Sequence, residues 1–555
     1  MWWRERSVIA VALLLLWLSL SGEVYSQFSP QGLQRMRQVT VLIESGSDRC
    51  SGVLISAGGL IATAAHGVDA DAGNIRVHLS DGLIQTASVV ARDEAGDTAL
   101  LRLQRAAGGV ALPCVPLRLR DRELSEGSAV FAAGFPARES IGSGAVLRSG
   151  VVKSAGLNVV RTTCSLTVGD SGGPLLDGEG RLVGLHRRIG AGAESNLHTS
   201  LTSLRHLLQR AAVKPAELPA ELPAEGTSVA IAAGVSGGGP EGESVRSLLA
   251  SQLPISMVEG GEVQGVQRLR GWLLTDSLLA VRLSALEPGR EYVVADRGHV
   301  RWRLKPVQHS YGLDLAIYQL FDGAEGAAAG MRPIAWREQP LQLFEQVHGV
   351  IGATGSNDVF VSAGGVVSRV DWREPSVRAV LGAELEEFEA SGGSRLRVVR
   401  TSPNSAAAFQ LEAGDLVMGT ESGAVGSRAQ FGELLRQRQP GDWLTLDVRR
   451  GEQQRLVHLK LGWDPAEQFE RTEYLDGRSG RVSDRRTGFA GVVQHDVPVV
   501  PDDCPQLLVD WQGLPVGLTI SRRARESSLA IPAAALMQLA NAGLDLRPSG
   551  KIFCP

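Results

Sequence analysis

The chain has few cysteines and few aromatic residues for its length. It has 555 residues, of which 5 are cysteines, and aromatic residues make up 5% of the composition. The cysteines are too sparse for a disulfide scaffold, and their odd number leaves at least one thiol unpaired. No Cys-x-x-Cys pair or His/Cys cluster has the spacing of a metal site, so we expect neither a metal nor a cofactor. The cysteines are Cys50, Cys114, Cys164, Cys504 and Cys554.

The sequence also lacks a surplus of positive charge. Its formal net charge is -4, from 56 Lys and Arg residues against 60 Asp and Glu residues. This balance argues against a dedicated nucleic-acid-binding protein, because no basic surplus is available to neutralise phosphates. The length exceeds what one hydrophobic core supports and predicts two to four domains.

Long apolar runs are missing beyond the N-terminus. Residues 1–26 are typical of a signal peptide, with Arg4 and Arg6 before the apolar run Val8–Leu20 and small residues before Gln27. An uncleaved anchor is the alternative, although the run is shorter than the roughly 20 residues that a membrane span needs. We therefore expect an exported protein, periplasmic or extracellular, with no stable membrane span after cleavage.

Short strand-like runs separated by glycine-rich turns follow from Val39 onward. They include Val39–Ile43, Leu60–Thr63 and Ala99–Leu103, whereas a helical spacing of leucines first occurs at Leu201–Ala212. Many short strands with such turns predict a mainly β fold, either a barrel or a sandwich.

Three motifs in this region carry the residues of nucleophilic catalysis. The segment Gly169–Pro174 reads Gly-Asp-Ser-Gly-Gly-Pro and holds Ser171 in a sterically open turn. A serine hydroxyl needs a base and an orienting carboxylate, and His66 and Asp97 occur upstream in Thr-Ala-Ala-His and Gly-Asp-Thr-Ala-Leu-Leu. Alone, each could be a turn serine, a core histidine or a turn carboxylate. Together they predict a catalytic triad.

A spacer then divides the chain. Lys214–Gly226 repeats Pro-Ala-Glu-Leu, and the glycine-rich Ser236–Pro240 follows it. Such composition is typical of a stiff, extended linker, which we place at 213–245.

Beyond the linker the pattern of the first domain recurs in an altered form. Gly271–Val281 parallels Gly52–Thr63, and Leu313–Tyr318 parallels Gly96–Leu101. Ser284 then occupies the position of His66. The following aspartate is Asp314, and its spacing from Ser284 is almost the same as the spacing of the histidine and aspartate in the first copy.

The counterpart of Ser171 in this second copy is Cys504, without the flanking glycines. The interval from Asp314 to Cys504 is much longer than the interval from Asp97 to Ser171, so the second copy has room for an inserted small domain. Loss of the histidine predicts an inactive copy. Two alternatives for Cys504 stay open: a nucleophile with His495 as its base, or a disulfide with Cys554.

At this point the first domain, 27–212, resembles trypsin-like serine proteases of the HtrA/Deg group. The chain order His66, Asp97, Ser171 matches the chymotrypsin-type order. The resemblance implies a double β-barrel in which His66 is the general base, Asp97 orients it, and Ser171 is the nucleophile. It also implies an oxyanion hole formed by the N–H groups of Gly169 and Ser171.

The inserted segment, 378–463, resembles a PDZ domain. Leu381, Gly382 and Ala383 match its carboxylate-binding loop, which implies a peptide ligand added as an edge strand. The two flanking parts, 246–377 and 464–555, then form a degenerate protease-like double barrel. This placement favours a regulatory role for the insert over substrate tethering.

Two features depart from the family. Asp170 matches digestive proteases, in which that aspartate binds a newly cut N-terminus, yet no activation site precedes Val39. How Asp170 is satisfied stays open, and a local basic partner is one hypothesis. Cys50 lacks its usual disulfide partner because Gly67 stands there. Arg187 and Arg188 are predicted near the substrate-pairing strand, either favouring acidic side chains or forming a solvated edge.

The sequence thus predicts an exported, ATP-independent serine endopeptidase that acts on unfolded or damaged polypeptides, as HtrA relatives do. Two alternatives remain, a peptide-binding or chaperone-like protein and a processing protease with a narrow substrate range. Homo-oligomers are common in this family, so the resemblance implies a possible homo-oligomer here.

Overall fold

The structure is a computed structural model that describes residues 30–545 with several gaps. The expected signal peptide, most of the expected linker and Cys554 lie outside the described residues. The chain divides into two compact units, one N-terminal and one C-terminal. The gaps are residues 70–73, 105–109, 118–123, 140–141, 191, 193–194, 220–246, 260–261, 265–268, 297–298, 325–330, 353–358, 363, 391–392 and 465–479.

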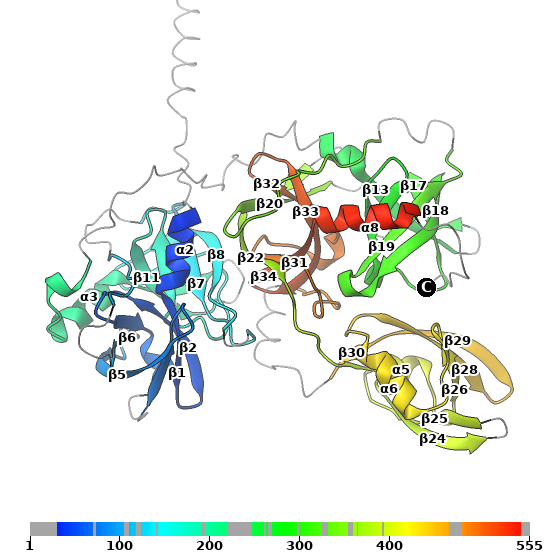
Figure 1. The fold of residues 1–555 in the computed structure, drawn as a ribbon, viewed down its shortest axis with the longest axis horizontal. Coiled ribbons are helices and arrows are strands. Elements are labelled where there is room, and N and C mark those ends of the chain that lie inside the picture. Colours follow the sequence, from blue (N-terminus) through cyan, green and yellow to red (C-terminus); the bar gives the residue numbers. More distant parts are fainter. Residues whose placement is uncertain are drawn as a thin grey trace, which may run out of the picture. The chain divides into compact units, whose positions relative to one another are not determined.

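The N-terminal unit consists of two closed six-stranded barrels (Figure 1). In the first, the strand order β1-β2-β3-β6-β5-β4 closes through the pairing of β1 with β4. The strands are short because glycine turns end them, and every residue of β3 is buried. They are β1 (Thr40–Ser45), β2 (Asp48–Leu54), β3 (Leu60–Thr63), β4 (Ile75–His78), β5 (Ile84–Asp93) and β6 (Thr98–Leu103).

The second barrel repeats this connectivity with the order β10-β11-β12-β9-β8-β7. Helix α2 (Pro30–Val39) precedes the first barrel, and α3 (Leu201–Arg210) follows the second and buries four leucines along one side. The strands are β7 (Ala129–Gly134), β8 (Val146–Ala155), β9 (Val159–Thr162), β10 (Pro174–Asp177), β11 (Leu182–Arg188) and β12 (Asn196–Ser200). The predicted mainly β, double-barrel fold is confirmed.

In the C-terminal unit, a first sheet has the order β13-β15-β16-β19-β18-β17, which matches that of the first barrel, with β14 added at its edge. The pairing of β13 with β17 closes it. Its strands are β13 (Gln252–Glu259), β14 (Glu262–Val263), β15 (Leu269–Leu273), β16 (Leu278–Arg282), β17 (Glu291–Asp296), β18 (His299–Ser310) and β19 (Leu315–Phe321).

A second sheet has the order β20-β22-β31-β34-β33-β32, matches the second barrel, and closes through β20 and β32. Helix α8 (Ala533–Asp545) takes the place that α3 has in the first unit. The strands are β20 (Gln346–Gly352), β21 (Val359–Val361), β22 (Gly365–Trp372), β31 (Val492–His495), β32 (Gln506–Asp510), β33 (Pro515–Ala524) and β34 (Ser527–Pro532). Trp272 and Leu536 belong to one buried core that both sheets share.

A separate small sheet is inserted in the connection from β22 to β31. Its main strand order is β24-β25-β26-β28-β29, it has its own core, and the short strands β23 and β30 pair where the chain enters and leaves (Figure 1). Its elements are β23 (Ala379–Val380), β24 (Ala383–Ala390), β25 (Gly393–Thr401), α5 (Ala406–Gln410), β26 (Leu416–Thr420), β27 (Gly423–Ala424), α6 (Arg428–Arg436), β28 (Trp443–Arg450), β29 (Gln453–Lys460) and β30 (Gly462–Trp463).

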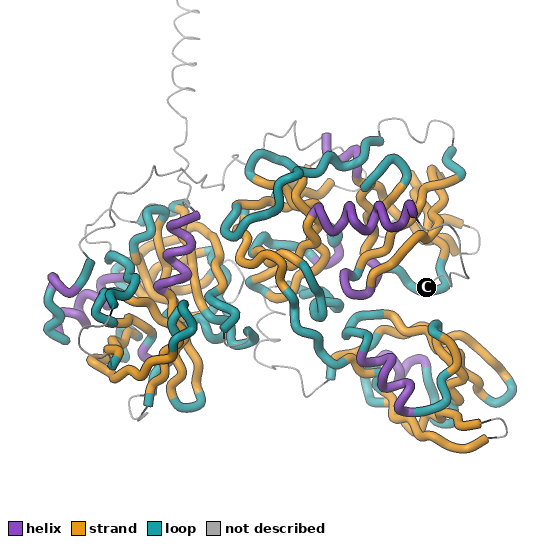
Figure 2. Tube along the Cα trace, viewed as in Figure 1, coloured by secondary structure: helices purple, strands orange, loops and turns teal. Residues whose placement is uncertain are grey.

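Strands outnumber helices in every part of the fold (Figure 2). Among the described residues, no helix is both long enough and apolar enough to cross a membrane.

Candidate active site

Three side chains from different elements of the N-terminal unit form one hydrogen-bonded row. His66 lies in the 3₁₀ helix η1 (Ala65–Gly67) directly after β3, Asp97 precedes β6, and Ser171 precedes β10. His66 Nε2 is 2.9 Å from Ser171 Oγ, and His66 Nδ1 is 2.9 Å from both carboxylate oxygens of Asp97. Because β3 and β6 are neighbouring strands, the turns at their ends bring the histidine and the aspartate together.

Asp97 holds His66 by both its ring and its main chain. The His66 N–H donates to Asp97 Oδ1 at 3.1 Å, and Asp97 has a φ of 50°, a left-handed conformation that aspartate tolerates. The Asp97 side chain is 11% exposed, whereas that of His66 is 49% exposed. Arg187, expected near the substrate strand, has its Nε 3.7 Å from Asp97 Oδ2. The imidazole is therefore fixed at one edge and open to solvent near the serine.

Gly169 and Ser51 fix the main chain around Ser171. Gly169 has a φ of 96°, and a Cβ there would lie 2.3 Å from the Phe135 carbonyl oxygen, so only glycine fits. The Ser51 hydroxyl donates to the Gly169 carbonyl at 2.8 Å and accepts from the Phe135 N–H at 2.9 Å. Within the described residues, the N–H groups of Gly169 and Ser171 have no protein acceptor.

The partner of Asp170 is Arg148 of β8. Arg148 Nη1 lies 2.7 Å from Asp170 Oδ2, and the two side chains are 0% and 1% exposed. A buried carboxylate without a cation would be strongly destabilising, so this pair holds Asp170 in place directly before Ser171. The hypothesis of a local basic partner therefore agrees with the geometry, although the sequence did not identify Arg148.

Two buried histidines lie behind the same turn. His186 Nδ1 is 2.9 Å from His198 Nδ1, and the main chain of His186 forms 2.8 Å hydrogen bonds with Gly172 and Gly173. Burial holds the pKa of His186 well below its ordinary value, with smaller effects from His198 and Arg148. Burial also lowers the pKa of His198 to about 3. Both rings are neutral at ordinary pH and brace the segment that follows Ser171.

No disulfide joins any two of the four cysteines among the described residues. The Cys50 thiol donates to the Gly67 carbonyl at 3.2 Å, and a Cβ at Gly67 would lie 2.8 Å from the sulfur. Gly67 has no thiol to bridge with Cys50, so the disulfide is absent at this position, as the sequence predicts.

In the C-terminal unit, the equivalent positions form a different arrangement. Asp314 again has a left-handed φ, of 52°, and accepts from the N–H of Ser284 at 2.6 Å. The Ser284 hydroxyl donates to the other carboxylate oxygen at 2.7 Å, where His66 has its ring. Burial raises the pKa of the Asp314 carboxyl, an effect that Arg282 partly offsets. This pair is a closed, buried hydrogen bond with no base.

Cys504 does not have the environment of a nucleophile. It is buried, and burial raises the pKa of its thiol to about 12, so little thiolate forms at neutral pH. His495 Nε2 is bonded to Thr519 Oγ1 at 3.0 Å, and its Nδ1 accepts from the Val497 N–H at 3.2 Å. The ring of the suggested base therefore has partners other than the thiol.

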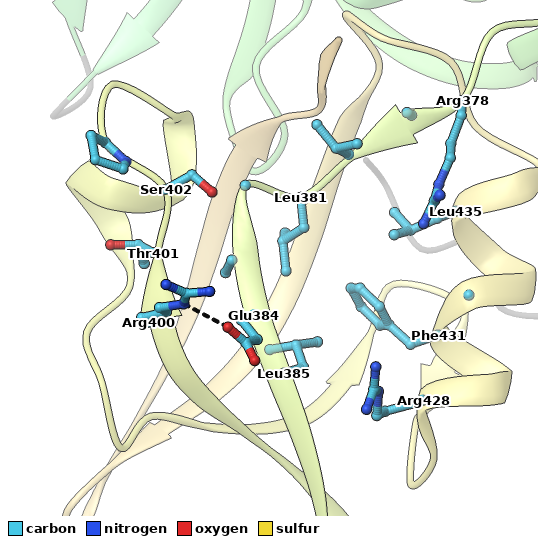
Figure 3. Close-up of a pocket in the computed structure, with 16 residues that line it drawn as sticks. Arg378, Leu381, Glu384, Leu385, Arg400, Thr401, Ser402, Arg428, Phe431 and Leu435 are labelled. Atoms are coloured by element: carbon cyan, nitrogen blue, oxygen red, sulfur yellow. Dashed lines mark hydrogen bonds and ion pairs between the residues drawn. The ribbon is translucent and has the colours of Figure 1, made fainter. Parts of the chain in front are cut away.

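The insert contains a groove between β24 and α6, with a volume of about 550 Å³. Leu381, Gly382 and Ala383, which the sequence predicts as a peptide-binding loop, are among the residues that line it, and Gly382 has a φ of 77°. Leu381 and Leu385 face Phe431 and Leu435 across the groove (Figure 3).

Sequence reasoning missed Ser51, Arg148 and the pair of His186 and His198. The best signal for Arg148 is a single arginine within the otherwise apolar and small run Gly144–Val152. Ser51 and the histidines give no comparable signal, because their roles depend on contacts with distant segments.

The part of the chain that matches a known protein family lies in the N-terminal unit. Residues 50–185 match the family described as a trypsin-like peptidase domain. A probable periplasmic serine endoprotease of the DegP-like type from Ectopseudomonas mendocina is 35% identical over 147 residues, 25% of this chain and 29% of that protein. The mitochondrial serine protease HTRA2 of Bos taurus is 37% identical over 149 residues, 24% of this chain and 30% of that protein.

The periplasmic serine endoprotease DegP of Salmonella typhimurium is 33% identical over 189 residues, 30% of this chain and 37% of that protein. The chain thus spans about a third of the length of these curated relatives. A crystal structure of the serine endoprotease from Yersinia pestis aligns with 80% of this chain and 100% of its own, at a TM-score of 0.30 and 15% identity.

Proposed function

We propose that this protein is an exported serine endopeptidase of the HtrA type that cleaves unfolded or damaged polypeptides. The proposal is supported by the match of residues 50–185 to a trypsin-like peptidase domain and by the similarity to DegP-like serine endoproteases. The observation that carries the proposal is the row Asp97–His66–Ser171, with 2.9 Å between the reacting groups. Export is supported by the signal-like residues 1–26 and by relatives named periplasmic.

In the proposed reaction, Ser171 Oγ attacks the carbonyl carbon of a bound peptide bond while His66 Nε2 takes the hydroxyl proton. Asp97 keeps the ring in the tautomer that has its proton on Nδ1 and stabilises the imidazolium that forms. The carbonyl oxygen becomes negative and accepts hydrogen bonds from the Gly169 and Ser171 N–H groups. One such donor is typically worth about 10²–10³ in rate.

The tetrahedral intermediate then collapses. His66 Nε2 gives its proton to the leaving amine, the C–N bond breaks, and an acyl ester remains on Ser171. Water enters, gives its proton to His66 and attacks the ester, and the same oxyanion contacts are used again. Transfer of the proton back to Ser171 releases the acid product and restores the free enzyme.

The C-terminal unit has a non-catalytic role in this proposal. The insert 378–463 is a PDZ-like peptide-binding domain with Leu381, Gly382 and Ala383 at its loop, carried by a degenerate protease-like double barrel at 246–377 and 464–555. The repeated strand order, the Ser284–Asp314 pair and the raised pKa of Cys504 support this role.

A casein digest tests the proposal with wild type, Ser171→Ala and Cys504→Ala. We expect cleavage by wild type and by Cys504→Ala, and none by Ser171→Ala. Labelling with a fluorophosphonate, mapped to the modified residue, should identify Ser171. If wild type and Ser171→Ala are equally inert towards casein and a panel of peptides, and no label is incorporated, the enzyme proposal is wrong.

A further inference from the structure

We propose that the groove between β24 and α6 selects polypeptide chain ends that carry an acidic residue third from the C-terminus. The inference rests on the proposed peptide-binding role of the insert and adds the chemistry of its ligand. It derives from the free backbone groups, the apolar wall and the arginines of the groove.

The groove offers hydrogen-bonding groups for an added strand. In the described part of the chain, β24 pairs with β25 along one edge and has no strand partner along the edge that faces α6. At its start, the N–H groups of Leu381 and Gly382 donate to no protein acceptor among the described residues. Free N–H groups beside a left-handed glycine suit a carboxylate, and an unpaired edge suits an extended peptide.

The end of the groove nearest these N–H groups is apolar. Leu381 and Leu435 face each other there, with Leu385 and Phe431 further along (Figure 3). A peptide whose carboxylate meets the Leu381 and Gly382 N–H groups would place its last side chain between these walls. We therefore expect an apolar last residue.

The charge of the groove lining is unbalanced. The lining contains three arginines, Arg378, Arg400 and Arg428, against one acidic residue, Glu384. Arg400 is already paired with Glu384 at 2.6 Å, whereas Arg378 and Arg428 form no ion pair with the described residues. The Arg428 N–H, and less strongly its charge, lower the pKa of the Glu387 carboxyl, so Glu387 offsets part of the Arg428 charge.

Arg378 and Arg428 lie at opposite ends of the groove, so they would lie near different residues of a bound peptide. Arg378 lies beside Leu435, at the end where the carboxylate would bind, and Arg428 lies at the other end, on the first turn of α6 (Figure 3). Leu435 and Arg428 are two turns apart on this helix, about 10 Å along its axis. Side chains two apart on a strand face the same way at roughly 6.7 Å, and the arginine side chain covers the remaining distance.

A peptide in this register alternates its side chains. The last and third-last residues point towards α6, and the second-last points away from it, on the side where Arg400 and Glu384 pair. An acidic third-last residue would therefore meet Arg428, and a basic one would be repelled. Because the guanidinium is exposed, the attraction should be modest and weaken with added salt.

The test uses the full-length Ser171→Ala protein and fluorescent peptides that end in the same apolar residue. The third-last position is Glu, Gln or Lys, and a fourth peptide has Glu with an amidated C-terminus. By fluorescence anisotropy at low salt, we expect the Glu peptide to bind about tenfold more tightly than the Lys peptide, with Gln between them. Amidation should remove most binding, and the Glu preference should shrink at high salt.

Two variants locate the effect. Arg428→Gln should bind Glu and Gln peptides equally, with the affinity for the Gln peptide unchanged. Arg436→Gln is the matched control, because Arg436 is on the same helix, outside the groove, and paired with Glu433. It should keep the preference.

The outcomes separate the two levels of the proposal. Equal binding of Glu, Gln and Lys peptides, or a preference that survives Arg428→Gln, overturns the acidic selection and leaves a peptide-binding groove. Equal binding of the amidated peptide overturns the recognition of chain ends. If none of the free-carboxylate peptides binds, the peptide-binding role itself is wrong.

Discussion

Replacing Arg148 with methionine should damage both the stability and the catalysis of the N-terminal unit. Methionine fills much of the arginine volume but leaves the Asp170 carboxylate, which is 1% exposed, without its cation. Breaking a buried ion pair in this way costs about 3–5 kcal/mol. In a domain of this size we expect the temperature of half-inactivation to fall by roughly 6–20 °C.

The catalytic effect follows from where Asp170 lies. Its neighbours Gly169 and Ser171 supply the proposed oxyanion donors, and Asp170 will move to find water or another donor. Misplacing one donor should lower kcat by about 10²–10³, with little change in KM, because these hydrogen bonds strengthen in the transition state. Peptide hydrolysis, measured well below the temperature of inactivation, separates this loss from unfolding.

Two controls make the test specific. Arg148→Met combined with Asp170→Asn removes both charges and should be more stable than Arg148→Met alone. Arg181→Met breaks the more exposed pair with Asp177 and should cost no more than about 1 kcal/mol, with kcat unchanged. The reasoning is refuted if Arg148→Met keeps a kcat within twofold of wild type, or if the double variant is no more stable than the single one.

Three further predictions concern the same unit and its counterpart. Gly172→Ala places a Cβ 2.1 Å from Thr63 Oγ1 at a φ of 82° and should lower kcat more than tenfold. The control Gly142→Ala has a similar φ of 95° but open space around the new Cβ, so it should keep the kcat of wild type. Equal losses of kcat in the two variants would contradict the steric argument. His186 and His198 have lowered pKa values in the folded state, so the unfolded state binds more protons below about pH 6.5. Stability should therefore fall as the pH drops below that value, by up to about 1.4 kcal/mol per histidine per pH unit, and for His198 the loss continues down to its folded pKa of about 3. Urea unfolding should show a shallower pH slope for His198→Gln than for wild type. Because burial raises the pKa of Cys504 to about 12, iodoacetamide at pH 8 should leave this thiol unmodified in the folded protein. Rapid modification would contradict the burial of the Cys504 thiol.

The parts of the site that the sequence predicted are those with local signatures. His66, Asp97 and Ser171 each lie in a short motif, and their order along the chain agrees with one geometry. The counterparts Ser284 and Asp314 could be located because the spacing between them is nearly the same as in the first copy. The left-handed conformation that Asp97 and Asp314 share shows how closely the two turns correspond.

The residues that support the triad could not be derived in this way. That Asp170 needs a cation follows from electrostatics, but the choice of Arg148 depends on the tertiary packing that brings β8 against the turn holding Ser171. Ser51 bridges Phe135 and Gly169, which lie 84 and 118 residues away. Such contacts come from tertiary packing, and they cannot be predicted from the periodicity of apolar residues or from the spacing of motifs in the sequence.

The pairing of β23 with β30 has a consequence for how the C-terminal unit unfolds. Ala379 faces Trp463, so the whole folded insert begins and ends at two neighbouring positions of one short ladder. While the insert is folded, its two ends are held side by side. Closing the barrel around the insert then costs no more loop-closure entropy than closing a short turn, such as the turn that joins β8 to β9. If the insert unfolds, the barrel must close a long flexible loop, at an extra cost of roughly 2–3 kcal/mol. The two bodies are therefore thermodynamically linked, and a ligand that stabilises the insert will also delay the melting of the barrel that carries it.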